Sequence, residues 1–300
     1  MGLTTNFNQS PYFDDYDESK NYHRVLFKPA VAVQARELTQ LQSILQNQVE
    51  RFGSNILVEG TIVRGGNFVE ENNLSYVKVL DIAYTPTGTE TSTDVNAYVG
   101  MKAVGSQTGI EGIIIATEYG LESQTPDLNT LFIKYTKSVL SGSNTNIRVF
   151  NTSESIQLYS QDVNGNYTNP NHLLTVAGSI EGTSAIGTGY GVRCGSGVIY
   201  QKGHFVNFIE DLTIVSKYSN LPDGVVVGFQ TAESIVNSNE DSSLLDNANG
   251  FNNENAPGAD RLKLTPTLVV KTLAEAATDE TFFAILIITF TLFFTRFFNA

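Results

Sequence analysis

The chain has 300 residues and a formal net charge of -13, from 31 acidic and 18 basic side chains. Only 16% of its residues are charged, well below the roughly 25% of an ordinary soluble domain. Because an acidic chain without a basic cluster lacks the electrostatic footprint of a nucleic-acid-binding protein, we expect no nucleic-acid partner.

Cysteine usage narrows the class of protein further. Cys194 is the single cysteine, which excludes an internal disulfide framework and any metal site built from several cysteines. This usage is typical of a protein assembled in a reducing cytoplasm. The N-terminus has neither the basic region nor the apolar core of a signal peptide.

Residues 1–30 predict an extended polar arm dotted with aromatic side chains. Pro11 and Pro29 punctuate its two ends, and the rings recur without a clean period. A segment with so many rings is rarely left free in water. We therefore expect the arm to lie on a partner, anchored by Tyr12, Phe13, Tyr16, Tyr22 and Phe27.

Residues 31–52 carry the only strong helical pattern, and Gly53 is expected to close the helix as a C-cap. One interpretation is a coiled-coil seam of about three heptads, with glutamines that cost stability but fix the register. The other is an amphipathic helix packed on a sheet, and Ile44 and Val49 widen the apolar stripe in that direction. The sequence leaves both open. The seam, and hence the expected oligomer interface, consists of Val31, Gln34, Leu38, Leu41, Leu45, Gln48 and Phe52.

From residue 54 onward the chain reads as a mainly β protein. Short runs rich in Val, Ile, Tyr and Thr alternate with Gly, Asn and Pro, which favours small sandwich or barrel modules over βαβ units. The expected organisation is a docking arm and helix (1–53), a first β module (54–150), a loop-rich linker (151–187), a second β module (188–270) and an apolar tail (271–300).

The tail is the most unusual segment. Residues 282–295 are 14 residues without a charge, short of the roughly 20 that a membrane-spanning helix needs. Arg296 interrupts any extension. Membrane anchoring is therefore not expected; a buried strand in a larger assembly, or an end altered by truncation or a frame shift, both remain open.

No catalytic or metal-binding constellation stands out. His23, His172 and His204 lack metal-ligand spacing, and the acidic segments fail the calcium-loop pattern. Cys194 and His204 are conceivable as a pair on neighbouring strands, but a buried structural cysteine is the preferred interpretation. We expect no enzyme activity, no metal and no cofactor.

Two stretches resemble a family of tailed-bacteriophage virion proteins, the tail-fibre or baseplate proteins of cyanophages and other myophages. The first is residues 6–66, whose most specific part is QARELTQL at residues 34–41. The second is SSLLDNANGFNNENAPGADRLKLTPTL, and GVIYQKGHFVNF lies between them. One departure is Ala30, where the family pattern has glycine after Pro29.

The resemblance implies a non-enzymatic virion component of the distal tail, assembled in the host cytoplasm and homotrimeric as fibres are. Its N-terminal region would dock to other baseplate and tail proteins and so support host attachment. An alternative function is a carbohydrate-binding adhesin that recognises a host surface glycan, with Tyr167 as a candidate contact.

Overall fold

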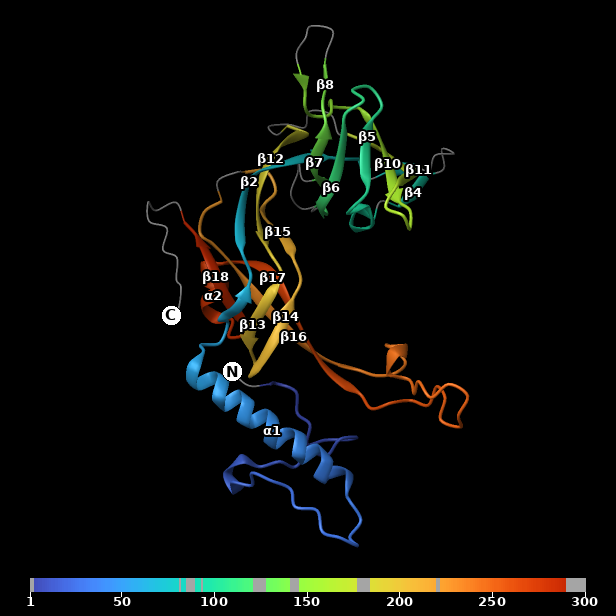
Figure 1. Ribbon diagram of the computed structural model, residues 1–300. Helices are drawn as coiled ribbons and strands as arrows, with labels where there is room; N and C mark the ends of the chain where they lie inside the picture. Colours follow the sequence, from blue (N-terminus) through green and yellow to red (C-terminus); the bar gives the residue numbers. More distant parts are fainter. Residues whose placement is uncertain are drawn as a thin grey trace.

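The computed structural model describes residues 3–80, 82–84, 90–92, 94–120, 128–140, 146–176, 184–219 and 222–289. The expected fold class is confirmed. The protein is mainly β, with 44% strand and 15% helix, and its main helix lies near the N-terminus. Figure 1 shows an elongated molecule, with this helix at one end and a β-rich lobe at the other.

The main helix, α1, spans Ala35–Ile56 and is displaced from the expected range at both ends. It begins at Ala35 because Gln34 is the N-cap, whose backbone N–H donates to Glu37 Oε2 at 2.8 Å. Gly53 lies inside the helix instead of ending it. A Cβ atom there would lie 2.5 Å from Cε2 of Tyr200, so glycine at this position lets the tyrosine ring pack directly on the helix backbone.

Most strands belong to one antiparallel sheet of ten. Two long strands near one edge of this sheet, β2 and β12, carry it from the middle of the molecule into the lobe far from α1 (Figure 1). In spatial order the strands are β15 (Asp211–Ser216), β12 (Ile186–Cys194), β2 (Phe68–Lys78), β7 (Thr130–Lys137), β6 (Glu111–Glu118), β5 (Lys102–Gly105), β10 (Ser155–Gln161), β11 (Tyr167–Thr175), β3 (Ile82–Tyr84) and β4 (Glu90–Ser92).

Three smaller sheets complete the described fold. One orders β1 (Ile62–Gly65), β13 (Gly197–Gln201) and β14 (His204–Phe208); another orders β17 (Arg261–Thr272), β16 (Val225–Val236) and β18 (Phe282–Ile288); the third pairs β8 (Val139–Leu140) with β9 (Asn146–Ile147). The short helical elements are η1 (Glu18–Lys20), η2 (Val95–Tyr98), η3 (Ser242–Leu244) and α2 (Leu273–Thr278).

Strand pairing does not follow the expected module boundaries. Within 151–187, expected to be a loop-rich linker, β10 and β11 form a hairpin of the large sheet. Strands β12 and β15 of the expected second module also join this sheet, through the pairing of β12 with β2. Residues 167–175 were expected to be a loop because their sequence is polar, with Asn169, Pro170 and Asn171 among them. Composition predicts which residues are exposed better than it predicts which strands pair.

The buried core is divided between the two regions that the large sheet connects. In the far lobe, Val77, Ile114, Leu131, Ile156 and Leu174 form part of one cluster. Nearer to α1, the second cluster joins β12, the β13–β14 hairpin and the β16–β17 pair. Its members include Val192, Cys194, Ile199, Phe208 and Phe229.

The expected apolar tail is partly accounted for by β18, which pairs with β16 along the edge of a sheet. Phe282 at its start is buried. Residues 290–300, with the remaining phenylalanines, lie outside the described residues. In the part of the chain that the structure describes, no helix is both long enough and apolar enough to cross a membrane.

Ala30 adopts a backbone conformation that explains why glycine suits this position. Its φ is 64°, in the left-handed region that costs a residue with a Cβ about 1–2 kcal/mol. We expect Ala30→Gly to slow proteolytic cleavage of the arm by about twofold to fivefold, because relief of strain exceeds the added chain entropy. Limited proteolysis followed by mass spectrometry measures this. Ala32→Gly, at an exposed neighbour without a positive φ, is the control; equal or faster cleavage in Ala30→Gly would contradict the strain argument.

Candidate assembly interface

Exposed apolar side chains are concentrated in the N-terminal fifth of the chain. Of the 23 large hydrophobic side chains exposed in the described part of the chain, twelve lie within residues 13–58. Contiguous exposed apolar surface on a protein marks a site of interaction. The twelve are Phe13, Tyr22, Leu26, Phe27, Val31, Val33, Leu38, Leu45, Val49, Phe52, Ile56 and Val58.

Five of these residues follow one face of α1 and are called the helix stripe. They are Leu38, Leu45, Val49, Phe52 and Ile56, which are between 44% and 67% exposed. Leu38, Leu45 and Phe52 are separated by seven residues, and Val49 and Ile56 follow Leu45 and Phe52 by four. This spacing places all five on the same side of a helix.

The opposite face of α1 packs on the rest of the chain. Ile44 is 4% exposed, Gln46 Nε2 donates to the carbonyl oxygen of Gly203 at 3.1 Å, and the hydroxyl of Tyr200 donates to the carbonyl oxygen of Glu50 at 2.9 Å. The amphipathic interpretation therefore describes the inner face. The outer face keeps the seam spacing and stays uncovered.

The structure redistributes the seven residues of the expected seam. Leu38, Leu45 and Phe52 belong to the helix stripe, Leu41 is half-buried at its border, and Gln48 is exposed. Val31 and Gln34 precede the helix, so they cannot continue the seam as helical positions. The expected helix range of 31–52 was wrong at its start, because the apolar pattern begins at Val31 whereas the helix begins after its N-cap, Gln34.

The arm folds back along α1 and neutralises charges on the helix (Figure 1). Asp15 pairs with Arg36, with 3.3 Å between Oδ2 and Nη1, and its Oδ1 accepts from Gln40 Nε2 at 2.6 Å. Glu18 pairs with Arg51 further along the helix. The arm's own carboxylates therefore pair with both arginines of α1.

The five aromatic residues expected to dock on a partner divide into two groups. Tyr12 and Tyr16 are half-buried on their own chain. Tyr12 donates to Asp260 Oδ2 at 2.6 Å, and this hydrogen bond is the main cause that raises the pKa of Tyr12. Tyr12 therefore anchors the arm on its own chain, whereas contact of these two tyrosines with another protein stays a prediction. Phe13, Tyr22 and Phe27 remain exposed.

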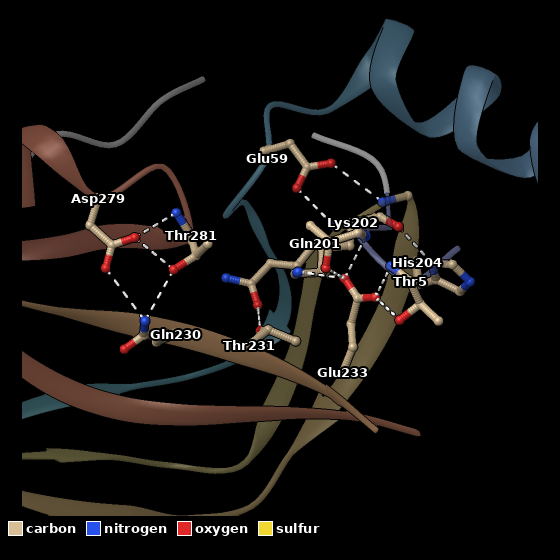
Figure 2. Close-up of polar contacts among 12 residues, drawn as sticks. Thr5, Glu59, Gln201, Lys202, His204, Gln230, Thr231, Glu233, Asp279 and Thr281 are labelled. Atoms are coloured by element: carbon tan, nitrogen blue, oxygen red, sulfur yellow. Dashed lines mark hydrogen bonds and ion pairs between the residues drawn. The ribbon is translucent and has the colours of Figure 1, made fainter. Parts of the chain in front are cut away.

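The start of the arm is held by a buried ion pair, which Figure 2 shows in close-up. Lys202 Nζ lies 2.6 Å from Glu233 Oε1, and the two side chains are only 3% and 5% exposed. The backbone N–H groups of Thr4 and Thr5 donate to the same carboxylate at 2.9 and 2.8 Å. Their hydroxyl groups do so as well. We call Thr4, Thr5, Lys202 and Glu233 the polar clamp.

A tight turn places Lys202 at the clamp. Lys202 and Gly203 join β13 to β14 with φ values of 52° and 75°, the conformation that two-residue hairpin turns require. Glu59, after the end of α1, accepts from the backbone N–H of Lys202 at 2.8 Å. His204 Nδ1 lies 2.7 Å from the carbonyl oxygen of Lys202, which identifies Nδ1 as the donor. The segment after α1, the hairpin and β16 thus meet at one point.

Hydrogen bonding sets the charge state of the clamp. Burial of the Glu233 carboxylate opposes its ionisation, but the hydrogen bonds from Lys202, Thr4 and Thr5 outweigh burial and lower the pKa of Glu233 to about 2. Gln201 beside it is fully buried; its side-chain oxygen accepts from the Thr231 hydroxyl, whereas its Nε2 has no hydrogen-bond partner among the described residues.

A second polar cluster in Figure 2 ties β18 to β16. Gln230 Nε2 donates to Thr281 Oγ1 at 3.0 Å and approaches Asp279 Oδ2 at 3.4 Å. Asp279 also pairs with Lys271, and the hydrogen bond from Lys271 is the main cause that lowers the pKa of Asp279 to about 2. The polar clamp therefore holds the start of the arm on β16, and the Asp279 cluster holds the start of β18 on β16.

The candidate catalytic pair is not supported by its geometry. Cys194 is fully buried, which confirms the structural interpretation of this cysteine. Burial and the charge of Asp211 raise the pKa of its thiol to about 12, so a nucleophilic thiolate is strongly disfavoured. Within the described ranges, no group of three or more His, Cys, Asp or Glu side chains is arranged to hold a metal ion.

Tyr167, the candidate glycan contact, is occupied within its own chain. Its hydroxyl donates to the carbonyl oxygen of Gly100 at 3.2 Å, and Lys102 Nζ lies 5.6 Å from the centre of its ring. The same ammonium lies 5.3 Å from the ring centre of Tyr159. The two tyrosines therefore flank a lysine on the β5–β10–β11 surface.

Sequence reasoning located the helix, the arm and Leu38, Leu45 and Phe52 of the helix stripe, but it missed the clamp. Thr5 and Glu233 are 228 residues apart in the chain, and no local pattern marks their contact. The one available signal was the Lys202–Gly203 turn, which predicts a hairpin without indicating what its lysine binds.

Comparison with known proteins gives one match. A family model described as a domain of unknown function (DUF4815) matches residues 10–105. No curated protein and no solved structure matches the chain. The matched segment includes α1, the helix stripe and most of the arm, so residues 10–105 of this chain are similar to a family whose function is not established.

Proposed function

We propose that this chain is a structural subunit of a bacteriophage tail, in a tail fibre or the baseplate. It has no enzymatic role and needs no cofactor. Its N-terminal region attaches the subunit to copies of itself and to other tail and baseplate proteins, and thereby supports host attachment by the virion. The resemblance of residues 6–66 and 242–268 to phage virion proteins supplies the biological context.

The helix stripe is the observation that carries this proposal. Its five apolar side chains are held in a rigid row, because the inner face of α1 packs on the β13–β14 hairpin through Ile44 and Gln46. Burying side chains that are about half exposed contributes on the order of 1 kcal/mol each, or about 5 kcal/mol per chain. A contiguous exposed apolar row of this kind is typical of an interaction site.

Self-association accounts best for the spacing of the row. Leu38, Leu45 and Phe52 repeat at seven residues, so copies of α1 around a symmetry axis bring identical positions together. The two arginines of α1, Arg36 and Arg51, are already paired with Asp15 and Glu18 of the same chain. Like charges on neighbouring copies are thereby reduced. A homotrimer, the usual state of fibres, is the assembly that we propose.

The test replaces an apolar residue of the stripe with a carboxylate. We expect the wild-type chain to form trimers and Leu45→Asp to weaken association by at least about a hundredfold, because each copy would bury an unpaired charge. Leu41→Asp, at the border of the stripe, should act in the same direction. Mass photometry of the purified chains over a range of concentrations measures the assembly.

Val163→Asp is the matched control, since Val163 is a fully exposed apolar residue distant from α1 in the chain. It should assemble like the wild type. A wild-type chain that stays monomeric at all concentrations, or a Leu45→Asp variant that assembles normally and enters particles, would contradict the proposal.

A host surface glycan is the alternative partner, favoured only by the Tyr159–Lys102–Tyr167 group. Aromatic rings beside a charged group can stack on sugar rings. Binding of the chain to a glycan array, abolished by Tyr159→Ala and retained by Leu45→Asp, would support the adhesin function; absence of binding would leave the structural role alone.

A further inference from the structure

The arm carries a second exposed surface, separate from the helix stripe. We call residues 20–33 the arm loop. Tyr22, Leu26 and Phe27 are exposed there, beside the exposed basic side chains of Arg24 and Lys28. The loop contains no acidic residue. In the described part of the chain, neither Arg24 nor Lys28 forms an ion pair.

An acidic surface, opposite in charge to the arm loop, lies at the end of the β16–β17 hairpin. Strands β16 and β17 pair along their whole length, and residues 237–260, which we call the hairpin loop, connect them. This loop has no lysine, arginine or histidine, and Phe251 within it is 76% exposed. Its five carboxylates are Glu240, Asp241, Asp246, Glu254 and Asp260.

The hairpin loop is ordered by its own backbone. Gly258 N–H donates to the carbonyl oxygen of Leu244 at 3.0 Å, and Asp246 exchanges two hydrogen bonds with Asn255 and Ala256. Glu254 and Asp241 each accept a further backbone N–H within the loop. Its carboxylates form no ion pair within the described residues. The loop therefore presents a preformed acidic surface with an exposed ring.

The two surfaces are held apart within one molecule. In Figure 1 the hairpin extends to one side of the body, whereas the arm loop lies beyond α1 at the end of the molecule. Tyr12 fixes the root of the arm at Asp260, at the base of the hairpin loop. One copy therefore does not bring its own basic arm loop onto its own acidic hairpin loop.

We propose that the arm loop of one copy binds the hairpin loop of a neighbouring copy. Arg24 and Lys28 face the carboxylates of the hairpin loop, and Phe251 packs among Tyr22, Leu26 and Phe27. This inference rests on the proposed assembly function and names the partner of the arm: a second copy of this chain. Because the two surfaces differ, the contact is head-to-tail and closes into a ring when the rotation between copies allows it.

Charge reversal tests the electrostatic part of this contact. Combined Arg24→Glu and Lys28→Glu should weaken association at least tenfold at low salt, with a smaller effect at high salt because exposed charges are screened. Combined Glu240→Lys and Glu254→Lys should do the same. A chain with all four reversals should recover association, since the attraction is restored with the signs exchanged.

The matched control is Arg64→Glu with Arg148→Glu, which changes the net charge equally at two exposed arginines outside the arm loop. It should leave association unchanged. If the control weakens association as much as the arm-loop variant, or if the fourfold reversal does not recover it, the contact is wrong.

Cross-linking between variants that each carry one added cysteine tests the contact directly. Ala32→Cys and Asn253→Cys, both at exposed positions, are mixed and treated with a short bis-maleimide. The buried Cys194 thiol, whose pKa is raised to about 12, stays unreacted. A cross-linked heterodimer is expected for this pair and not for Ala32→Cys mixed with Val163→Cys. Equal yields from the two mixtures would overturn the proposal.

The outcomes separate this inference from the proposed function. A wild-type trimer that Leu45→Asp dissociates, but whose Ala32–Asn253 cross-link does not exceed the control, leaves the assembly function standing and removes the arm-to-hairpin contact. A monomeric wild-type chain removes both.

Discussion

Replacing Lys202 with methionine is expected to lower the free energy of unfolding by about 3–5 kcal/mol, the cost of leaving a buried carboxylate without its charged partner. The Lys202 and Glu233 side chains are almost completely buried, with 2.6 Å between Nζ and Oε1. Methionine is unbranched like lysine and one atom shorter, and it removes the charge. Urea denaturation followed by circular dichroism measures the change.

Removing the second charge should recover much of this loss. In Lys202→Met with Glu233→Gln, no charge is left buried, and the glutamine oxygen still accepts from Thr4 or Thr5. The double variant is expected to be more stable than Lys202→Met alone. A Lys202→Met variant within about 1 kcal/mol of the wild type, or a double variant that loses the sum of both single effects, would show that the pair is not coupled.

The same pair contributes to acid sensitivity. The pKa of Glu233 is lowered from 4.5 to about 2, so the folded state binds this proton less readily than the unfolded state. Its contribution to stability is present above pH 4.5 and is lost as the pH falls toward 2. Lys202→Met, which removes the main partner that lowers this pKa, should show a weaker loss of stability across that interval.

Replacing Glu154 with alanine is expected to cost about 2–4 kcal/mol, because the buried N–H of Thr108 and the part-buried N–H groups of Gln107 and Asn151 lose their acceptor, and an unpaired buried group costs about 1–3 kcal/mol. Glu154 is fully buried. Its carboxylate accepts from the N–H groups of Gln107, Thr108 and Asn151 at 2.7, 2.6 and 2.8 Å. It thereby ties the turn between β5 and β6 to the segment before β10.

Glu154→Gln separates hydrogen bonding from packing. Glutamine fills the same space but turns one acceptor into a donor. Glu154→Gln should therefore lower the free energy of unfolding, but by less than Glu154→Ala. Denaturation measures the free energy of unfolding, and hydrogen exchange of the Gln107 and Thr108 amides reports the local effect. Fast exchange is expected at these amides in Glu154→Ala; unchanged exchange would contradict the assigned role of the carboxylate.

The pattern of neighbouring residues was sufficient to predict elements whose conformation depends on those residues alone. The apolar spacing of residues 38–52 predicted a helix because successive turns place those side chains on one face. The run VVVGFQTAESIV is rich in β-branched residues, which favours a strand, and β16 covers these same twelve residues. The Lys202–Gly203 pair predicted a hairpin turn because left-handed conformations favour glycine. Each prediction concerns a contact within a few residues.

Local pattern failed where a distant residue decides the outcome. Gly53 resembles a helix end, yet the ring of Tyr200 packs on it and the helix continues to Ile56. The short turn at 195–197 is typical of two strands paired in one sheet, yet it carries the chain from β12 in the large sheet to β13 in another. Strand pairing is a long-range property, and a strand's sequence indicates its two faces better than its neighbours.

The sequence by itself determined the mainly β class, the position of the helix, the apolar repeat on its outer face, and the acidic character of the chain. These follow from composition and from periodicities of a few residues. Only the tertiary structure decided that the strands on both sides of residue 151 share one sheet. It also decided that Thr4 and Thr5 bind Glu233, and that Tyr12 binds Asp260 while the helix stripe stays uncovered. The physical reason is that burial, ion pairing and backbone hydrogen bonds join residues that are far apart in the chain, and no periodicity along the chain encodes which ones meet.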